Sequence, residues 1–160
     1  MAKATRAAFG ETLIKLADEG MDIMAVDADL CGSTTTAKFG AAYPDRLFDV
    51  GIAEQNMIGV ASGLALTGRT VFTGSFAVFG TGRCWEQIRN TVCDSGLNVK
   101  ICPTHAGITV GADGATHQAL EDIALMRVLP GMRVLVPADY DACATALKLA
   151  AATPGPVYVR

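Results

Sequence analysis

Short apolar runs alternate with segments of helical periodicity along the chain, and this alternation most limits the possible folds. Six runs have the composition of buried strands: 22–26, 47–50, 70–73, 98–102, 132–136 and 156–159. They are mainly apolar runs rather than alternating ones, which is typical of strands that helices cover on both faces. Strands separated by helical segments of about a dozen residues indicate βαβ units. The sequence therefore predicts an α/β fold with a doubly wound, mainly parallel sheet of about six strands.

Five segments show helical periodicity. Gly20 and Gly68 are expected to end the first two helices, Pro130 the fourth, and Asp139 to be the N-cap of the last. The polar run at 32–36 predicts a loop. The faces predicted to point inward are Phe9, Leu13 and Leu16; Met57, Val60, Ala61, Leu64 and Ala65; Trp85, Ile88 and Val92; Leu120, Ile123 and Ala124; and Cys143, Ala146, Leu147 and Ala150.

Composition narrows the functional classes. The 160 residues fit a single domain, 1–160, with 13 basic and 16 acidic side chains and a net charge of −3. No basic stripe suggests nucleic-acid binding, and no apolar stretch is long enough to cross a membrane. We expect a cytoplasmic protein without a signal peptide. The 5 cysteines and 2 histidines lack the spacing of a metal site, so no metal is expected on this chain.

Polar residues follow nearly every predicted strand, where ligands bind in open parallel sheets. Such a convergence favours an enzyme site, although loops are also polar because they are wet. The residues at these positions are Asp27 and Asp29, Glu54, Ser75 and Phe76, Thr104 and His105, Asp139, and Arg160.

Glu54 lies between a predicted strand and a predicted helix that starts near Gln55. One interpretation is a carboxylate that only stabilises the helix N-terminus, an effect of about 0.3–1 kcal/mol. The other is a partly buried acid, with a pKa raised by desolvation, that shares a proton with a ligand nitrogen. The spacing leaves both open.

Phe76 and Phe79 also allow two interpretations. They either belong to the core or face the crevice at the strand ends and stack on a flat heterocycle. The glycine-spaced loop 107–114 is either an irregular turn or a phosphate-binding nest. It has no GxGxxG motif and no Walker A lysine, so NAD binding and P-loop chemistry are not supported.

Three separated motifs resemble the pyrimidine-binding domain of transketolase-type thiamine-diphosphate enzymes. The run Asp49–Asn56 (DVGIAEQN) resembles the pyrimidine-binding motif, and Ser75–Arg83 is similar to the cofactor-stacking region. The runs Thr104–Gly107 and Gly111–Gln118 resemble the substrate-channel loop. The resemblance extends from about Arg6 to Arg160 with compatible spacings.

The resemblance implies that thiamine diphosphate binds between two domains and that this chain supplies only the pyrimidine-binding one. The diphosphate domain's Gly-Asp-Gly signature, followed by Asn, is missing: Ala112 precedes Asp113-Gly114, and no Asn follows Asn98. A diphosphate-binding partner subunit would therefore hold Mg²⁺ and the diphosphate, in an assembly expected to be a homodimer or a heterotetramer. The family's small C-terminal domain is missing too.

The resemblance also implies roles for individual residues. Glu54 would hydrogen-bond the pyrimidine nitrogen and favour the tautomer that activates the thiazolium carbon. Phe76 and Phe79 would flank the pyrimidine, although a third aromatic position of the family is Gly82 here. The remaining matches are Asp29, facing the cofactor; Asp113 and His117, at substrate hydroxyls; and Arg6, Ser33, His105 and Arg160, at a sugar phosphate. The resemblance makes Glu54, His105 and His117 the expected catalytic residues.

Arginine forks and a hydroxyl suit a phosphate dianion, but Arg6 and Arg160 could equally be ordinary solvated charges. The expected reaction is transfer of a two-carbon ketol unit between phosphosugars. The 1-deoxy-xylulose-5-phosphate synthase type is the alternative within the superfamily, but it usually has arginine where His105 stands, and the dehydrogenase E1 β subunit matches less well. A non-catalytic domain that dimerises with or regulates a full-length enzyme is the alternative from another class.

Overall fold

The computed structural model describes residues 3–160. Their strands form one six-stranded, entirely parallel sheet in the order β2-β1-β3-β4-β6-β5. The predicted α/β class and the predicted strands are confirmed, each strand to within a few residues. The strands are β1 (Ile23–Asp27), β2 (Leu47–Asp49), β3 (Thr70–Gly74), β4 (Val99–Ile101), β5 (Arg133–Leu135) and β6 (Val157–Val159).

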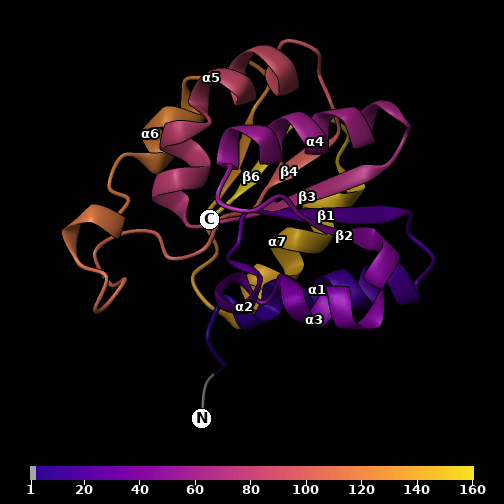
Figure 1. The fold of residues 1–160 in the computed structure, drawn as a ribbon, viewed down its shortest axis with the longest axis horizontal. Helices are drawn as coiled ribbons and strands as arrows, with labels where there is room; N and C mark the ends of the chain where they lie inside the picture. Colours follow the sequence, from indigo (N-terminus) through magenta and orange to yellow (C-terminus); the bar gives the residue numbers. More distant parts are fainter. Residues whose placement is uncertain (1–2) are drawn as a thin grey trace.

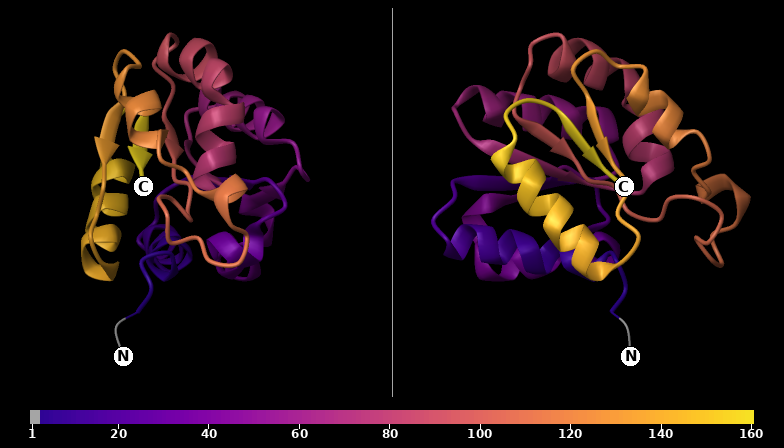
Figure 2. Two further views of the ribbon diagram at one scale, coloured as in Figure 1. Left: turned by 90° about the vertical axis from the view of Figure 1, so that its left-hand side faces the viewer. Right: turned by 180° about the vertical axis from the view of Figure 1, so that it is seen from behind.

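Helices cover both faces of the sheet (Figure 1). One layer contains α1 (Ala7–Asp18), α2 (Cys31–Thr34), α3 (Thr36–Ala42) and α7 (Tyr140–Ala152). The other contains α4 (Glu54–Leu66), α5 (Trp85–Gln87) between the π-helical segments η2 (Val78–Arg83) and η3 (Ile88–Cys93), and α6 (Asp122–Arg127). Figure 2 shows the sheet edge-on between these two layers. The 3₁₀ turns are η1 (Pro44–Arg46) and η4 (Ala115–His117).

Each layer of helices encloses its own apolar core. Two adjacent residues of β3 contribute to different cores, because successive side chains of a strand point to opposite faces of the sheet. Phe72 packs with Phe9 and Leu147 on the α1/α7 side, whereas Val71 packs with Ile58 and others on the α4 side. No helix among residues 3–160 is long and apolar enough to span a bilayer.

The stretch predicted as a loop at 32–36 is instead α2 and the start of α3. The buried Asp27 carboxylate explains these short helices. Its oxygens accept hydrogen bonds from the backbone N–H of Leu30 at 2.8 Å and from the hydroxyls of Thr34 and Thr36 at 2.7 Å each. Thr35, with φ 72°, divides the two helices. These two helices are too short to show a helical pattern of apolar residues in the sequence, and contacts to Asp27 stabilise them instead.

The prediction for the fourth helix is partly wrong. It begins at Asp122, and Leu120 and Ala124, predicted to point inward, are exposed. Met126 and Leu129 supply the buried apolar contacts instead. The segment around Trp85 is helical as predicted, but π-type turns interrupt it on both sides. Asp139 is confirmed as the N-cap of α7, where its carboxylate accepts from the N–H of Ala142 at 2.8 Å.

Candidate functional site

A cavity of about 350 Å³ lies at the carboxyl edge of the sheet, where the chain leaves β1 for α2, β2 for α4 and β3 for η2. β2 and β3 lie on opposite sides of β1, so this is a point where the direction of strand order changes. Ligands of open parallel sheets bind at such points. The cavity is lined by Ala28, Asp29, Leu30, Ile52, Glu54, Phe79, Arg83, Thr116 and His117.

Glu54 is the first residue of α4 and is 6% exposed. The turn before the helix uses Gly51, whose φ of +72° favours glycine. The Glu54 carboxylate lines the cavity, and its Oε1 accepts a hydrogen bond from Nη1 of Arg83 at 2.9 Å. The predicted place at a helix N-terminus is therefore confirmed. The side chain also faces a space where it could meet a ligand.

Phe76 and Phe79 have different environments. Phe76 is buried, and an isolated parallel bridge to Thr104 extends the pairing of β3 and β4 at this point. Phe79 is partly buried and lines the cavity. Their ring centroids are 6.2 Å apart, and the two rings are nearly parallel. The core interpretation is therefore correct for Phe76, and the crevice interpretation is correct for Phe79.

Both histidines pack on these phenylalanines. The His105 ring centroid lies 4.1 Å from that of Phe76. The His117 ring meets Phe79 edge-on, with centroids 5.2 Å apart and an interplanar angle of 77°. Residues 105–120, orange in Figure 1, extend outward from the edge of the sheet. The His117 ring of this segment also lies near Phe76, with ring centroids 6.2 Å apart.

Asp29 lines the same cavity as Glu54. Its φ of 61° is in the left-handed region, where a non-glycine residue stores strain. Asp49 supports this conformation: its Oδ1 accepts hydrogen bonds from the N–H of Asp29 at 2.9 Å and of Gly51 at 3.0 Å. One carboxylate thus ties together the two loops that carry Asp29 and Glu54.

A second cavity, of about 390 Å³, opens at the same edge between α1, α7 and the end of β6. Arg6, His105 and Arg160 contribute its basic side chains. The remaining lining is Thr5, Phe9, Cys102, Pro103, Thr104, Ala106, Thr109, Val136, Pro137, Cys143, Leu147 and Val159.

Arg6 and His105 are in direct contact. Nη1 of Arg6 lies 3.3 Å from Nε2 of His105 and donates to the carbonyl of Ser33 at 3.3 Å. Burial, followed by the positive charge of Arg6, lowers the pKa of His105 below its usual 6.5. The hydroxyl of Thr104 lies 2.7 Å from Nδ1 and fixes the ring from its other side.

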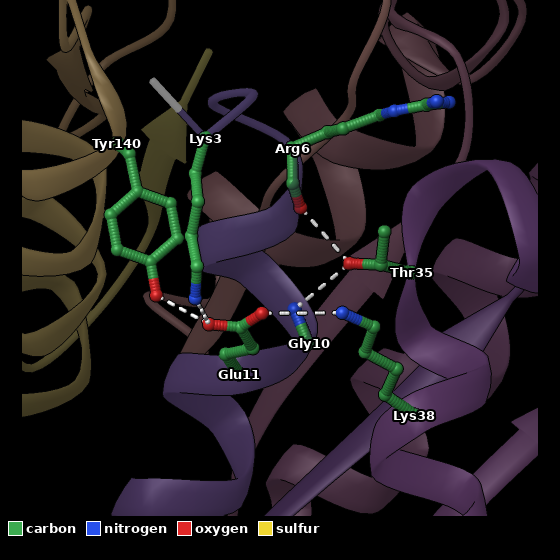
Figure 3. A network of polar contacts seen from close by, with 7 residues as sticks. All are labelled: Lys3, Arg6, Gly10, Glu11, Thr35, Lys38 and Tyr140. Carbon is green, nitrogen blue, oxygen red and sulfur yellow. Dashed lines mark hydrogen bonds and ion pairs between the residues drawn. The ribbon is translucent and has the colours of Figure 1, made fainter. Parts of the chain in front are cut away.

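The backbone of Arg6 is anchored separately from its side chain. The hydroxyl of Thr35 donates to the Arg6 carbonyl at 2.9 Å and accepts from the N–H of Gly10 at 3.1 Å. Figure 3 shows the guanidinium of Arg6 extending away from this anchor and from the neighbouring cluster around Glu11. The start of α1 is therefore a fixed base for a cationic side chain.

Arg160 is held by a buried acid. Its Nε and Nη2 donate to the two carboxylate oxygens of Asp122 at 2.8 and 3.2 Å, and the Tyr158 hydroxyl donates to the same group at 2.6 Å. Asp122 is fully buried and raises the pKa of Arg160. The guanidinium is thus oriented, and its charge is already paired with a protein carboxylate.

Three of the predicted residues line neither cavity: Phe76, Ser33 and Asp113. Ser33 meets Arg6 through its carbonyl, and its hydroxyl lines neither space. Asp113 is exposed in the loop 107–114, close enough to raise the pKa of His105 slightly against the other effects. Within that loop the N–H of Gly114 donates to the carbonyl of Gly111, as in an ordinary turn.

The structure therefore sorts the predicted residues into two groups. Asp29, Glu54, Phe79 and His117 line the first cavity, whereas Arg6, His105 and Arg160 line the second. Phe76 packs between the groups. The residues that the sequence analysis missed are Asp49, Arg83 and Asp122, which bind site residues through contacts spanning 20, 29 and 38 positions.

Among residues 3–160 no group of three or more His, Cys, Asp or Glu side chains could hold a metal ion. Burial raises the pKa of the thiols of Cys84 to about 12 and of Cys143 to about 11, so both are protonated at neutral pH.

A parallel α/β domain with an acid-lined cavity at the turning point of its strand order is a class of ligand-binding fold that many families share. Residues 1–160 match the family described as transketolase, pyrimidine binding domain. The chain belongs to this family, which depends on thiamine diphosphate.

Individual relatives agree with this membership. The chain is 54% identical over 158 residues to a protein of Methanocaldococcus jannaschii named as a transketolase C-terminal section, covering 99% of this chain and 50% of that one. It is 41% identical over 158 residues to human transketolase, covering 98% of this chain and 25% of the human protein. The chain thus spans half of the first relative and a quarter of the second.

Solved structures give the same result. A split-gene transketolase, described as an inactive β4 tetramer, superposes with a TM-score of 0.88 at 51% sequence identity, covering 100% of this chain and 51% of that one. Transketolase from Campylobacter jejuni also superposes with a TM-score of 0.88, at 26% identity, covering 99% and 25%. The predicted resemblance to the transketolase family is confirmed.

Proposed function

We propose that this chain is the pyrimidine-binding part of a thiamine-diphosphate-dependent transketolase and acts together with a diphosphate-binding subunit. The complete enzyme would transfer a two-carbon ketol unit between phosphosugars in the cytoplasm. The observation that carries the proposal is the buried Glu54 carboxylate, which opens into a cavity beside the ring of Phe79.

The lining of the first cavity fits an aminopyrimidine. Such a ring is flat and apolar on its faces, with nitrogen donors and acceptors along its edge. Phe79 provides an aromatic surface, and Glu54 provides a carboxylate already fixed at a helix start. When bound, thiamine diphosphate supplies the nucleophilic carbon that carries the two-carbon unit.

Glu54 would share a proton with the pyrimidine ring nitrogen. Its low exposure excludes water from one side, which strengthens a hydrogen bond to the ring. Asp29 and His117, which line the same cavity, would face the cofactor and the substrate hydroxyls, with Asp113 in the same outer loop as His117.

The second cavity suits the phosphate of a sugar substrate. Arg6 and the oriented guanidinium of Arg160 supply positive charge, and His105 adds a ring nitrogen. Phe76 packs against His105 of this cavity and Phe79 of the first, so an extended substrate would reach from the phosphate site past His105 to the cofactor. Ser33 would take part only if its hydroxyl turned toward the ligand.

The magnesium ion and the diphosphate would be held by the partner subunit, because the described residues of this chain contain no metal-binding cluster. The similarity to a split-gene transketolase supports a two-chain enzyme. We infer a heterotetramer built from two copies of each subunit, with a homodimer of this chain as the alternative.

The test is a ketol-transfer assay on the complex of this chain with its complementary subunit, thiamine diphosphate and Mg²⁺. Glu54→Gln should lower kcat by about 10²–10⁴-fold, the usual contribution of a positioned acid or base. Glu86→Gln, which changes an exposed glutamate on α5, is the matched control and should leave kcat unchanged.

Full activity of the Glu54→Gln complex would reject the role of Glu54. A complex that binds the cofactor but transfers no ketol unit would instead favour a regulatory domain. Sugar substrates with and without phosphate test the second cavity: replacing both Arg6 and Arg160 should raise KM for the phosphorylated sugars far more than for the others.

A further inference from the structure

The proposed pyrimidine site already contains a flat cation that belongs to the chain itself. Nη1 of Arg83 donates to Oε1 of Glu54 at 2.9 Å, and the guanidinium carbon lies 4.2 Å from the centroid of the Phe79 ring. The side chain of Arg83 is 53% exposed, whereas that of Glu54 is 7% exposed. A half-exposed arginine thus pairs with a buried carboxylate.

The same ion pair forms a wall between two spaces. One space is the first cavity, which contains Asp29 and His117. The other is a separate hollow beside the start of α4, lined by Ile52, Ala53, Glu54, Gln55, Asn56 and Arg83. Glu54 and Arg83, together with Ile52, line both of them. If the arginine side chain moved outward, the carboxylate would open to both hollows at once.

The contacts of Arg83 resemble those that an aminopyrimidine would make. A guanidinium is planar, stacks on aromatic faces and donates N–H groups to a carboxylate. An aminopyrimidine hydrogen-bonded to Glu54 and stacked on Phe79 needs the same oxygen and the same ring face. The two groups therefore cannot hold these positions together.

We propose that Arg83 is an internal competitor for the pyrimidine of the cofactor and thereby sets the affinity of the site. Without cofactor it pairs with Glu54 and covers Phe79; on binding, the guanidinium swings into solvent and the ring takes its place. This inference rests on the proposed function of Glu54 and concerns a residue to which the sequence analysis assigned no role.

The cost of displacing Arg83 is small, because half-exposed ion pairs and exposed cation–π contacts are both weak. Removing the competitor should therefore tighten cofactor binding by about threefold to tenfold, not by orders of magnitude. Had Arg83 been buried like Asp122, displacement would have been far more costly.

The experiment is calorimetric titration of thiamine diphosphate, with Mg²⁺, into the complex of this chain and its complementary subunit. Arg83→Ala should lower Kd about threefold to tenfold, and Arg83→Gln should have a smaller effect in the same direction. Arg89→Ala is the matched control, since Arg89 is an exposed arginine of the adjoining segment that bonds Asn90.

Inorganic diphosphate serves as a second probe. If Arg83 instead attracts the anionic end of the cofactor, Arg83→Ala weakens binding of both probes, and the proposal is overturned. Unchanged binding of thiamine diphosphate also overturns it. Failure of the wild-type complex to bind thiamine diphosphate at all rejects the proposed function as well. Unfolding temperatures of the variants verify that each is folded.

Discussion

Three non-glycine residues of the described backbone have positive φ: Asp29 at 61°, Thr35 at 72° and His105 at 56°. All three lie at the candidate site or beneath it. Each such residue costs about 1–3 kcal/mol and persists only where surrounding contacts enforce it. Here the enforcing contacts are hydrogen bonds to side chains or backbone, such as that from the Asp29 N–H to Asp49. The strain thus falls where the proposed ligands would bind.

The contact between Arg6 and His105 has a measurable electrostatic consequence. Arg6→Met should raise the pKa of His105 toward 6.5, because burial still lowers it but the neighbouring positive charge is gone. A titration of the imidazole protons by NMR measures the change. Arg127→Met, at an exposed arginine in the last turn of α6, should leave the pKa of His105 as it is. An identical titration curve for Arg6→Met would mean that the two side chains are apart in solution.

At the scale of elements, the crossing of α1 and the α2–α3 corner depends on a glycine. A Cβ on Gly10 would overlap the carbonyl oxygen of Thr35, whereas one on Gly63 of α4 would meet nothing within 4 Å. The first helix can therefore approach the corner only where it has no side chain.

Two alanine variants test this contrast. Gly10→Ala should lower the free energy of unfolding by about 1–3 kcal/mol, because the clash exceeds the gain in helix propensity. Gly63→Ala should raise it by about 0.5–1 kcal/mol, since an exposed helical glycine only loses entropy on folding. Urea unfolding of both variants measures the difference. Equal effects of the two changes would show that α1 lies farther from Thr35.

The elements that sequence predicted well are those with a local signal. Apolar runs identify the six strands, and Glu54 is the first residue of a long apolar helix. The missed features depend on contacts between distant positions. α2 and α3 form around the carboxylate of Asp27, and the environment of Arg160 depends on Asp122, 38 positions away. No local pattern distinguishes such acids from ordinary surface charges.

At the scale of the whole molecule, Glu11 joins three parts of one helical layer (Figure 3). Its carboxylate on α1 accepts hydrogen bonds from Tyr140 of α7 at 2.5 Å, from Lys3 at 2.9 Å and from Lys38 of α3 at 3.2 Å. The hydroxyl of Tyr140 has the largest effect, and together these donors lower the pKa of Glu11 to about 2.

This cluster predicts a specific loss of stability in acid. The pKa of Glu11 is lower in the folded state than its ordinary 4.5, so its stabilising contribution is fully present above pH 4.5 and disappears as the pH falls toward about 2. Urea unfolding across this range should show a smaller pH dependence for Glu11→Gln than for the wild type. Glu19→Gln, at an exposed glutamate just after the same helix, should keep the wild-type slope. Parallel curves for Glu11→Gln and the wild type would contradict the cluster.

All the strands run in the same direction, and both cavities lie where strands end. The turns at the other rim, such as 67–69 and 94–97, come before β3 and β4 and line neither cavity. A fluorophore or surface tether on the exposed Ser95 would thus be separated from Glu54 and His105 by the length of the strands. The protein could therefore be immobilised through that rim while both cavities stay accessible to ligands.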